Sequence, residues 1–168
     1  VQIHRASDDT IEFFGGTANV HHILLSGCED DLFDWTNGWS GKAQFVIGHQ
    51  LTDVAGERGI EADNLGDDHD AEPRSMPTLY NFTFIGDPDS ANGSDAVKLR
   101  RGTGATIRNF LAFGFAESCL DISDDATWDQ VAAGDLGIMN STFGPDGCPD
   151  GGENVTLFEG EATNAYTD

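Results

Sequence analysis

Two kinds of short apolar segment alternate along the chain. In the first kind, apolar residues alternate with mostly polar ones, which is the period-2 pattern of a strand with one buried face. Its copies lie at 11–15, 33–36, 60–63, 97–100 and 120–123. The second kind opens on a polar side chain and closes on glycine, with copies at 22–27, 44–48, 81–86, 109–114 and 140–144. The repeating unit is therefore a pair of strands.

The spacing of these pairs predicts a solenoid. Equivalent residues of the first segment are 22, 27, 37 and 23 positions apart, which is the range of repeat architectures. The connectors lack the apolar spacing of a crossover helix, so parallel strands must stack by coiling. We predict an all-β, right-handed parallel β-helix of about five rungs. An antiparallel β-sandwich also has short strands, but it does not explain the alternation.

The same pattern sets the expected boundaries. We predict one domain over 1–168, with core rungs at about 10–145, an acidic inserted loop at 64–76 and an irregular tail at 145–168. In the second segments, the opening Asn, Gln or His should form a polar ladder at a bend. The closing glycine should supply a positive φ at the corner.

Stacking the first segments in register assigns every side chain a face. The inward column should be Ile11, Phe13, Phe33, Trp35, Ile60, Ala62, Val97, Leu99, Leu120 and Ile122. One outward row should contain Glu12, Asp34, Glu61, Lys98 and Asp121, and the next Phe14, Thr36, Asp63, Arg100 and Ser123. Two carboxylates about 4.8 Å apart repel by about 3.5 kcal/mol at an effective dielectric constant of 20. A raised pKa, a bound cation or Lys98 could relieve Asp34 and Glu61.

Charge excludes some classes of partner. The chain has 30 acidic and 8 basic residues, a net charge of -22 and a pI near 4.1, so it should repel nucleic acid and anionic membranes. No apolar run approaches the ~20 residues of a membrane span. The excess of Asp over Glu and the scarcity of lysine indicate adaptation to salty, marine water or to divalent cations.

Several strings resemble a known group of proteins. They are EFFGGT at 12–17, FDWTNGWSGKAQF at 33–45, GIEADN at 59–64, PTLYNFTFIG at 77–86 and LRRGT at 99–103. They resemble uncharacterised Asp-rich secreted or lipoprotein β-helix proteins of marine and predatory bacteria. The resemblance covers most of 10–145 and implies an extracellular or outer-surface location. It also implies a longer parent chain, with end-to-end continuation of the β-helix, but no catalytic residues.

Two sets of residues are candidates for chemistry. If the protein is an enzyme, the outward rows predict Asp34, Glu61, Asp63, Lys98 and Arg100 as the catalytic residues of a polysaccharide lyase or glycoside hydrolase. The alternative is a salt-bridge ladder without function. For calcium, the predicted ligands are Asp67, Asp68 and Asp70 in the inserted loop and Asp87, Asp89 and Asp95 in a second loop on the same side. Calcium prefers six to eight oxygen ligands, and the alternative is a solvated acidic surface.

The tryptophans and cysteines complete the candidates. Trp39 lies in a turn and is predicted to be an exposed platform for polysaccharide, whereas Trp35 should belong to the core. Cys119 and Cys148 should lie about one rung apart, within reach of a disulfide. Cys28 lies four rungs away and should remain unpaired, either as a buried thiol or awaiting a missing partner.

Three functions remain open from the sequence. The leading hypothesis is a non-catalytic secreted or surface module that binds glycan, divalent cations or a partner, because no complete catalytic set is visible. The second is a polysaccharide lyase or hydrolase. The third is a segment of a structural stalk or adhesin, since an uncapped β-helix invites stacking at its strand edges.

Overall fold

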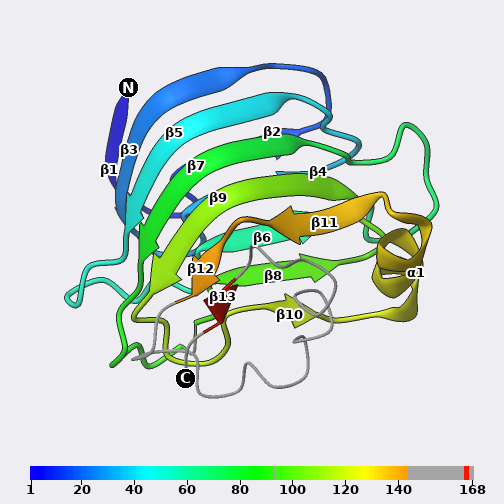
Figure 1. Ribbon diagram of the computed structural model, residues 1–168. Helices are drawn as coiled ribbons and strands as arrows, with labels where there is room; N and C mark the ends of the chain where they lie inside the picture. The colour runs from blue at the N-terminus through cyan, green and yellow to red at the C-terminus, as the bar shows by residue number, and fades with distance from the viewer. Residues whose placement is uncertain (93, 144–164, 167–168) are drawn as a thin grey trace.

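The chain forms a parallel β-helix, as predicted. The computed structural model describes residues 1–92, 94–143 and 165–166, and Figure 1 shows strands stacked in two sheets that are not closed. Sheet B has five strands in the order β10-β8-β6-β4-β2. They are β2 (Glu12–Phe14), β4 (Phe33–Thr36), β6 (Ile60–Asp63), β8 (Val97–Arg100) and β10 (Asp121–Ile122).

Sheet A contains the second strand of each rung. Its order is β1-β3-β5-β7-β9-β12-β13, and β11 also pairs with β9. The strands are β1 (Gln2–Ala6), β3 (Val20–Cys28), β5 (Lys42–His49), β7 (Thr78–Ile85), β9 (Ala105–Phe113), β11 (Leu136–Met139), β12 (Thr142–Phe143) and β13 (Ala165–Tyr166). The solenoid thus begins at β1, before the expected boundary near residue 10. Apart from β13, the expected tail lies outside the described residues.

The register of sheet B confirms the predicted columns. Glu12 pairs with Asp34, Asp34 with Glu61, and Glu61 with Lys98, which pairs with Asp121. The inward column is buried from β4 to β10. Ile11 and Phe13 are only partly buried, because they lie in the first rung and have a neighbouring rung of sheet B on one side only.

A row of left-handed residues bends the long strands of sheet A. Five residues have φ between 53° and 59°: His22, Phe45, Asn81, Asn109 and Asn140. The first four occupy equivalent positions, because the residue that follows each of them pairs with its counterpart in the next strand. His22, Asn81 and Asn109 therefore lie within strands rather than opening them, and Asn140 lies between β11 and β12. The predicted ladder is present in part, since the Asn109 amide donates to Asn81 Oδ1 at 3.0 Å. At rung two the bend is at Phe45, not at Gln44.

The glycines that close these strands have two different roles. Gly27 and Gly114 have φ of 61° and 76°, as predicted. Gly48 and Gly86 do not have positive φ, and their role is close packing: a Cβ on Gly48 would lie 2.6 Å from the Phe84 ring, and one on Gly86 would lie 2.5 Å from the Gly114 carbonyl. Gly144 lies outside the described residues.

One connector is helical, which was not predicted. The helix α1 (Asp125–Ala133) joins β10 to β11. Asp124 caps it by accepting from the Thr127 amide, and Gly134 ends it with φ of 83°. None of the described helices is long and apolar enough to cross a membrane.

The two acidic loops lie at opposite ends of the strands. The inserted loop joins β6 to β7, whereas the loop with Asp87, Asp89 and Asp95 joins β7 to β8. Because β7 spans the rung from one end to the other, the prediction that both loops lie on the same side is wrong (Figure 1).

Candidate functional site

Five carboxylates gather on the outer side of sheet B. Asp9 and Asp31 precede β2 and β4, and parallel stacking brings them beside Glu12, Asp34 and Glu61. Carboxylate oxygens of Asp31, Asp34 and Glu61 lie within 4.8 Å of one another, as do those of Asp9, Glu12 and Asp34. Asp34 belongs to both groups and so lies at the centre. We call these five residues the acidic cluster.

The cluster is partly withdrawn from solvent and incompletely bonded. Asp31 is 2% exposed and Glu61 is 8% exposed. The Oδ1 atom of Asp34 is buried and has no hydrogen-bond partner among the residues that the structure describes. A buried acceptor without a donor costs about 1–3 kcal/mol. This atom therefore lacks a positive partner at the centre of the cluster.

Two arginines supply part of the missing charge. Arg58 Nη1 lies 2.8 Å from Glu61 and 3.8 Å from Asp31, and its backbone amide donates to Asp31 at 2.8 Å. Arg100 pairs with Glu61 and, at 2.7 Å, with Asp63. Two arginines against five carboxylates leave the acidic cluster with net negative charge if all five are ionised.

Burial raises the pKa of the cluster carboxyls. Burial first, and then the charge of Asp9, raises the pKa of Asp34 to about 9. Burial and the charge of Glu61 raise the pKa of Asp31 to about 8, although Arg58 opposes this. Burial and the charge of Asp9 raise the pKa of Glu12 to about 7. At neutral pH, protons therefore occupy sites that a metal ion could take.

The predicted catalytic residues are only partly brought together. Asp34 and Glu61 lie in the acidic cluster, while Asp63 pairs with Arg100 and, at 2.6 Å, with Arg101. Lys98 does not relieve Glu61. Its Nζ lies 2.7 Å from Asp121 and 3.7 Å from Asp95. Lys98 therefore pairs with Asp121, its neighbour in the row on the side away from Glu61.

Sequence reasoning missed Arg58, which lies just before β6. The sequence contained a signal, which is that Arg58 precedes Glu61 by three residues. In the structure the two side chains are in contact. It also missed Asp9 and Asp31, each of which lies three residues before a member of the outward row. Parallel stacking extends beyond the strand ends, so residues just before a strand also form columns.

The loop aspartates predicted as calcium ligands do not converge. Among the described residues, no group of three close ligand atoms includes Asp67, Asp68, Asp70, Asp87, Asp89 or Asp95. Asp70 pairs with Arg74 at 2.9 Å, and Asp95 accepts from the Ser118 hydroxyl at 2.6 Å. Calcium binding by these loops remains a prediction, and their geometry does not support it.

Trp39 is not an exposed platform. Its side chain is fully buried and stacks on Phe13, with the ring centroids 4.2 Å apart. Its indole N–H donates to the Ala18 carbonyl at 3.1 Å. The turn at Asn37 and Gly38, both with positive φ, folds the side chain inward, so the prediction of a sugar-stacking Trp39 is wrong. Trp35 is buried, as predicted.

The cysteine predictions are tested in part. Cys28 is a free, buried thiol, which donates to the Asp30 carbonyl at 3.2 Å, and burial raises its pKa to about 12. Cys119 is buried. Cys119 forms a disulfide, whereas its predicted partner Cys148 lies outside the described residues, so the pairing of Cys119 with Cys148 remains a prediction.

Comparison with known proteins identifies the family. A family model described as a pectate-lyase-like β-helix domain matches residues 1–166. No curated protein and no solved structure matches the chain significantly. The match covers nearly the whole chain and agrees with the two parallel sheets, so this protein belongs to the pectate-lyase-like β-helix domain family.

Proposed function

We propose that this chain is a secreted or cell-surface β-helix module that binds a divalent cation in the acidic cluster without catalysis. The observation that carries the proposal is the buried, unpartnered Oδ1 of Asp34, which lies among the carboxylates of Asp31 and Glu61. A cation at this position would satisfy Asp34 and offset the mutual repulsion of the cluster.

The donor set favours calcium among the common cations. Every ligand atom is a carboxylate oxygen, which suits hard cations. Calcium accepts irregular arrangements of six to eight oxygens, whereas magnesium needs near-octahedral geometry. Because ligands must lose their protons to bind a metal, the raised pKa values of Asp31 and Asp34 predict tighter binding at higher pH.

The location belongs to the same proposal. The resemblance to Asp-rich secreted proteins of marine and predatory bacteria supports an extracellular or outer-surface setting. Calcium modules outside cells bind with dissociation constants of about 10⁻⁴–10⁻³ M, and a site with two arginines beside it suits that weak range.

Calorimetric titration tests the proposal. Calcium and magnesium are titrated at matched ionic strength in high monovalent salt, which screens the net charge. We expect one calcium site in the millimolar range or tighter, with at least tenfold weaker binding to Asp34→Asn. Asp129→Asn is the control, because Asp129 is an exposed helix residue outside the cluster. Identical responses to the two cations, or unchanged binding by Asp34→Asn, would contradict the proposal.

Glycan cleavage is a second candidate function. It is favoured by one observation, a proton-holding Asp34 within 4.8 Å of Glu61, since glycosidases pair an acid with a nearby carboxylate. The burial of Glu61 and its pairing with two arginines argue against access by a substrate. Incubation with neutral and acidic polysaccharides in calcium, followed by a reducing-end assay, should give no cleavage.

A third candidate is a segment of a stalk or adhesin. Among the described strands, β1 and β2 are each paired on one side only. Ile11, which precedes β2, and Phe13, which lies within it, are partly buried. Unpaired edges and incompletely covered apolar residues favour the stacking of a further rung.

A further inference from the structure

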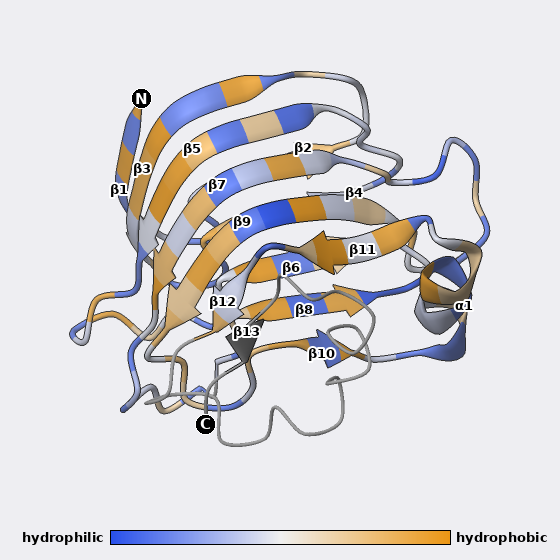
Figure 2. Ribbon diagram, viewed as in Figure 1, coloured by the Kyte–Doolittle hydropathy of each residue, from blue (hydrophilic) through white to orange (hydrophobic). Residues whose placement is uncertain are grey.

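The long strands of sheet A are apolar on both faces after their bends. They continue there as ILL at 23–25, VIG at 46–48, FTFI at 82–85 and FLAF at 110–113, and Figure 2 shows hydrophobic residues of neighbouring strands side by side across the sheet. Continuous apolar runs are typical of strands that are covered on both sides. The inner side is covered by the core, as at Val46 and Phe82, but the outer side is exposed, with Ile47 at 51%.

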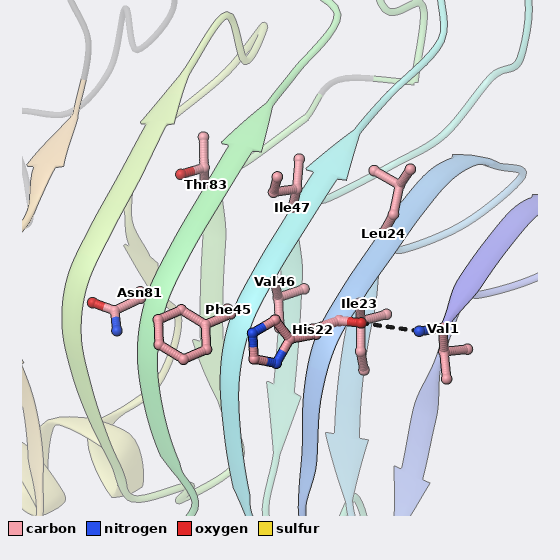
Figure 3. Close-up of a pocket in the computed structure, with 9 residues that line it drawn as sticks. All are labelled: Val1, His22, Ile23, Leu24, Phe45, Val46, Ile47, Asn81 and Thr83. Atoms are coloured by element: carbon pink, nitrogen blue, oxygen red, sulfur yellow. Dashed lines mark hydrogen bonds between the residues drawn. The ribbon is translucent and has the colours of Figure 1, made fainter.

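Register places the outward residues of this region in two rows across the sheet. In the first row, Leu24 pairs with Ile47 and Thr83 pairs with both Ile47 and Leu111. Figure 3 shows the side chains of Leu24, Ile47 and Thr83 on adjacent strands. The two rows are Gln2, Leu24, Ile47, Thr83, Leu111 and Thr142, and His4, Ser26, His49, Ile85 and Phe113. We call these two rows the neutral face.

The neutral face differs in charge from the rest of the molecule. None of its residues is Asp, Glu, Lys or Arg, and the described strands of sheet A contain no Asp or Glu, although the chain has 30 acidic residues. Charged residues are depleted at the core of protein interfaces, whereas they are common on surfaces that face water. The neutral face therefore has the composition of an interface core.

A second copy of the chain is the occupant that this charge pattern favours. Each copy has a net charge of -22, so two copies repel each other and approach most readily where neither presents a carboxylate. A basic partner would instead be attracted to the acidic side chains of sheet B and would gain nothing from a face without charge. Twofold symmetric dimers, in which both copies contribute the same surface, are also the commonest oligomers.

The neutral face is large enough for a dimer. Six strands contribute to it, in the order β1-β3-β5-β7-β9-β12. At about 4.8 Å per strand and about 3.3 Å per residue, the face measures about 29 Å by 20 Å. A symmetric contact therefore buries about 1,200 Å² in total, which is at the lower end of specific interfaces and above most accidental contacts. An interface of this size suits a reversible dimer.

We propose that two copies of this chain form a symmetric dimer through the neutral face of sheet A. The two sheets pack about 10 Å apart, as sheets packed face to face do. Leu24, Ile47 and Leu111 of each copy are removed from water, which drives the association. The acidic side chains of sheet B stay in water, where salt screens their repulsion. The dimer does not require a cation in the acidic cluster, because that cluster lies on sheet B.

Sedimentation velocity tests the proposal. The chain is measured with EDTA, at concentrations from about 1 to 200 µM, in about 0.15 M and about 1 M NaCl. EDTA makes the result independent of any cation in the acidic cluster. We expect a monomer–dimer equilibrium with a dissociation constant on the order of 10 µM at the lower salt concentration. At the higher salt concentration the dissociation constant should fall at least about threefold, because the repulsion between the copies is screened.

Substitutions locate the interface. Ile47→Asp and Ile47→Lys should each raise the dissociation constant at least about tenfold, because each buries an unpaired charge. Their opposite signs separate this effect from a change in overall repulsion, which Ile47→Lys would reduce. Phe14→Asp is the matched control, since Phe14 is 68% exposed but lies on sheet B, and it should leave the dimer unchanged. Leu111→Gln tests the same face without adding charge and should weaken the dimer about threefold.

Circular dichroism melts show that each variant is folded, and all should melt within a few degrees of the parent, because the replaced side chains are exposed. Several results would overturn the proposal. They are a chain that stays monomeric at both salt concentrations, and a dimer that the folded Ile47 and Leu111 variants form as tightly as the parent. A dimer that Phe14→Asp weakens, or that forms only when calcium replaces EDTA, would also overturn it, because the contact would then lie on sheet B.

Discussion

Asp31 and Asp34 differ by a few local contacts. Both are largely withdrawn from water, and burial is the main cause of the raised pKa in each. Asp31 accepts from the Arg58 amide and lies 3.8 Å from its guanidinium. Asp34 has neither contact, and its Oδ1 has no donor within the described part of the chain. Asp34 is therefore the residue whose state depends most on what else enters the acidic cluster.

Asp34→Asn should stabilise the metal-free protein at alkaline pH. The folded-state pKa of about 9 lies above the ordinary value of 3.8, so the folded chain holds a proton that the unfolded chain has lost. The contribution of this proton to the free energy of unfolding is complete below pH 3.8 and is lost as the pH rises toward 9. Asparagine has no proton to lose in this range, so the variant does not lose this contribution.

In EDTA at pH 8, the variant should gain on the order of 2 kcal/mol, or several degrees in Tm. At pH 4 the two proteins should melt within about a degree of each other. Thermal melts from pH 4 to 9 measure this, with Asp129→Asn as the control. A variant that is less stable than the parent at pH 8 would show that Asp34 is ionised and well solvated.

Residue chemistry was predictable where it follows the strand period. Asp34 and Glu61 were placed correctly in one outward row, because register alone determines that row. Trp39 was misplaced because its direction depends on a turn with two positive φ values, which the alternation of residues does not encode. Arg58 was missed because it lies outside the strand and reaches Glu61 with a long side chain.

At the scale of elements, the alternation of apolar and polar residues specifies the strands. The bends are specified by a left-handed backbone conformation at one residue of each strand. The row of positive φ values in sheet A bends the long strands β3, β5, β7 and β9, whereas at Asn140 the next rung is divided into β11 and β12. The helix α1 could not be found from apolar periodicity, since its buried residues are the polar Thr127 and Gln130. Its capping residues, Asp124 and Gly134, were the available signal.

Gly48→Ala should destabilise β5. A Cβ at this position would lie 2.6 Å from Phe84 Cδ1 and 3.0 Å from a Leu32 methyl group, so the core must shift. Overpacking of this kind costs about 1–3 kcal/mol. Gly137→Ala in β11 is the matched control, because its Cβ would meet only the Met139 methyl group at 3.8 Å.

Urea denaturation of both glycine variants measures the difference. The midpoint should fall for Gly48→Ala and stay level or rise slightly for Gly137→Ala, since alanine restricts the unfolded chain. Equal midpoints would mean that the core beside Gly48 can relax without cost.

At the scale of the whole molecule, the two sheets divide the chemistry between them. Sheet B has the acidic cluster and its two arginines, while the described strands of sheet A contain no Asp or Glu and carry the exposed ring of Phe45. Fold class and register were predictable from the sequence, because both follow from one repeating pattern. The division between the faces was not recognised, because the row through Phe45 appears only when the second strands are aligned at their bends.

The stacked rungs also predict how far the effect of a destabilising substitution extends along the solenoid. Leu99 is fully buried and pairs with Ala62 on one side and Ile122 on the other. Leu99→Asp buries an unpaired carboxylate, which costs several kcal/mol, comparable with the whole stability of a domain. Ile3→Asp makes the same change in β1, where Ile3 is partly buried and pairs only with Leu25.

Because each rung contacts only its neighbours, Leu99→Asp should abolish the cooperative thermal transition, while Ile3→Asp should keep it. Circular dichroism melts measure the transition, and hydrogen–deuterium exchange locates the loss of protection. For Ile3→Asp, that loss should be confined to β1 and β3. If exchange instead rises equally along all rungs in both variants, the chain unfolds as a single cooperative unit and the edge strand is as important as the centre.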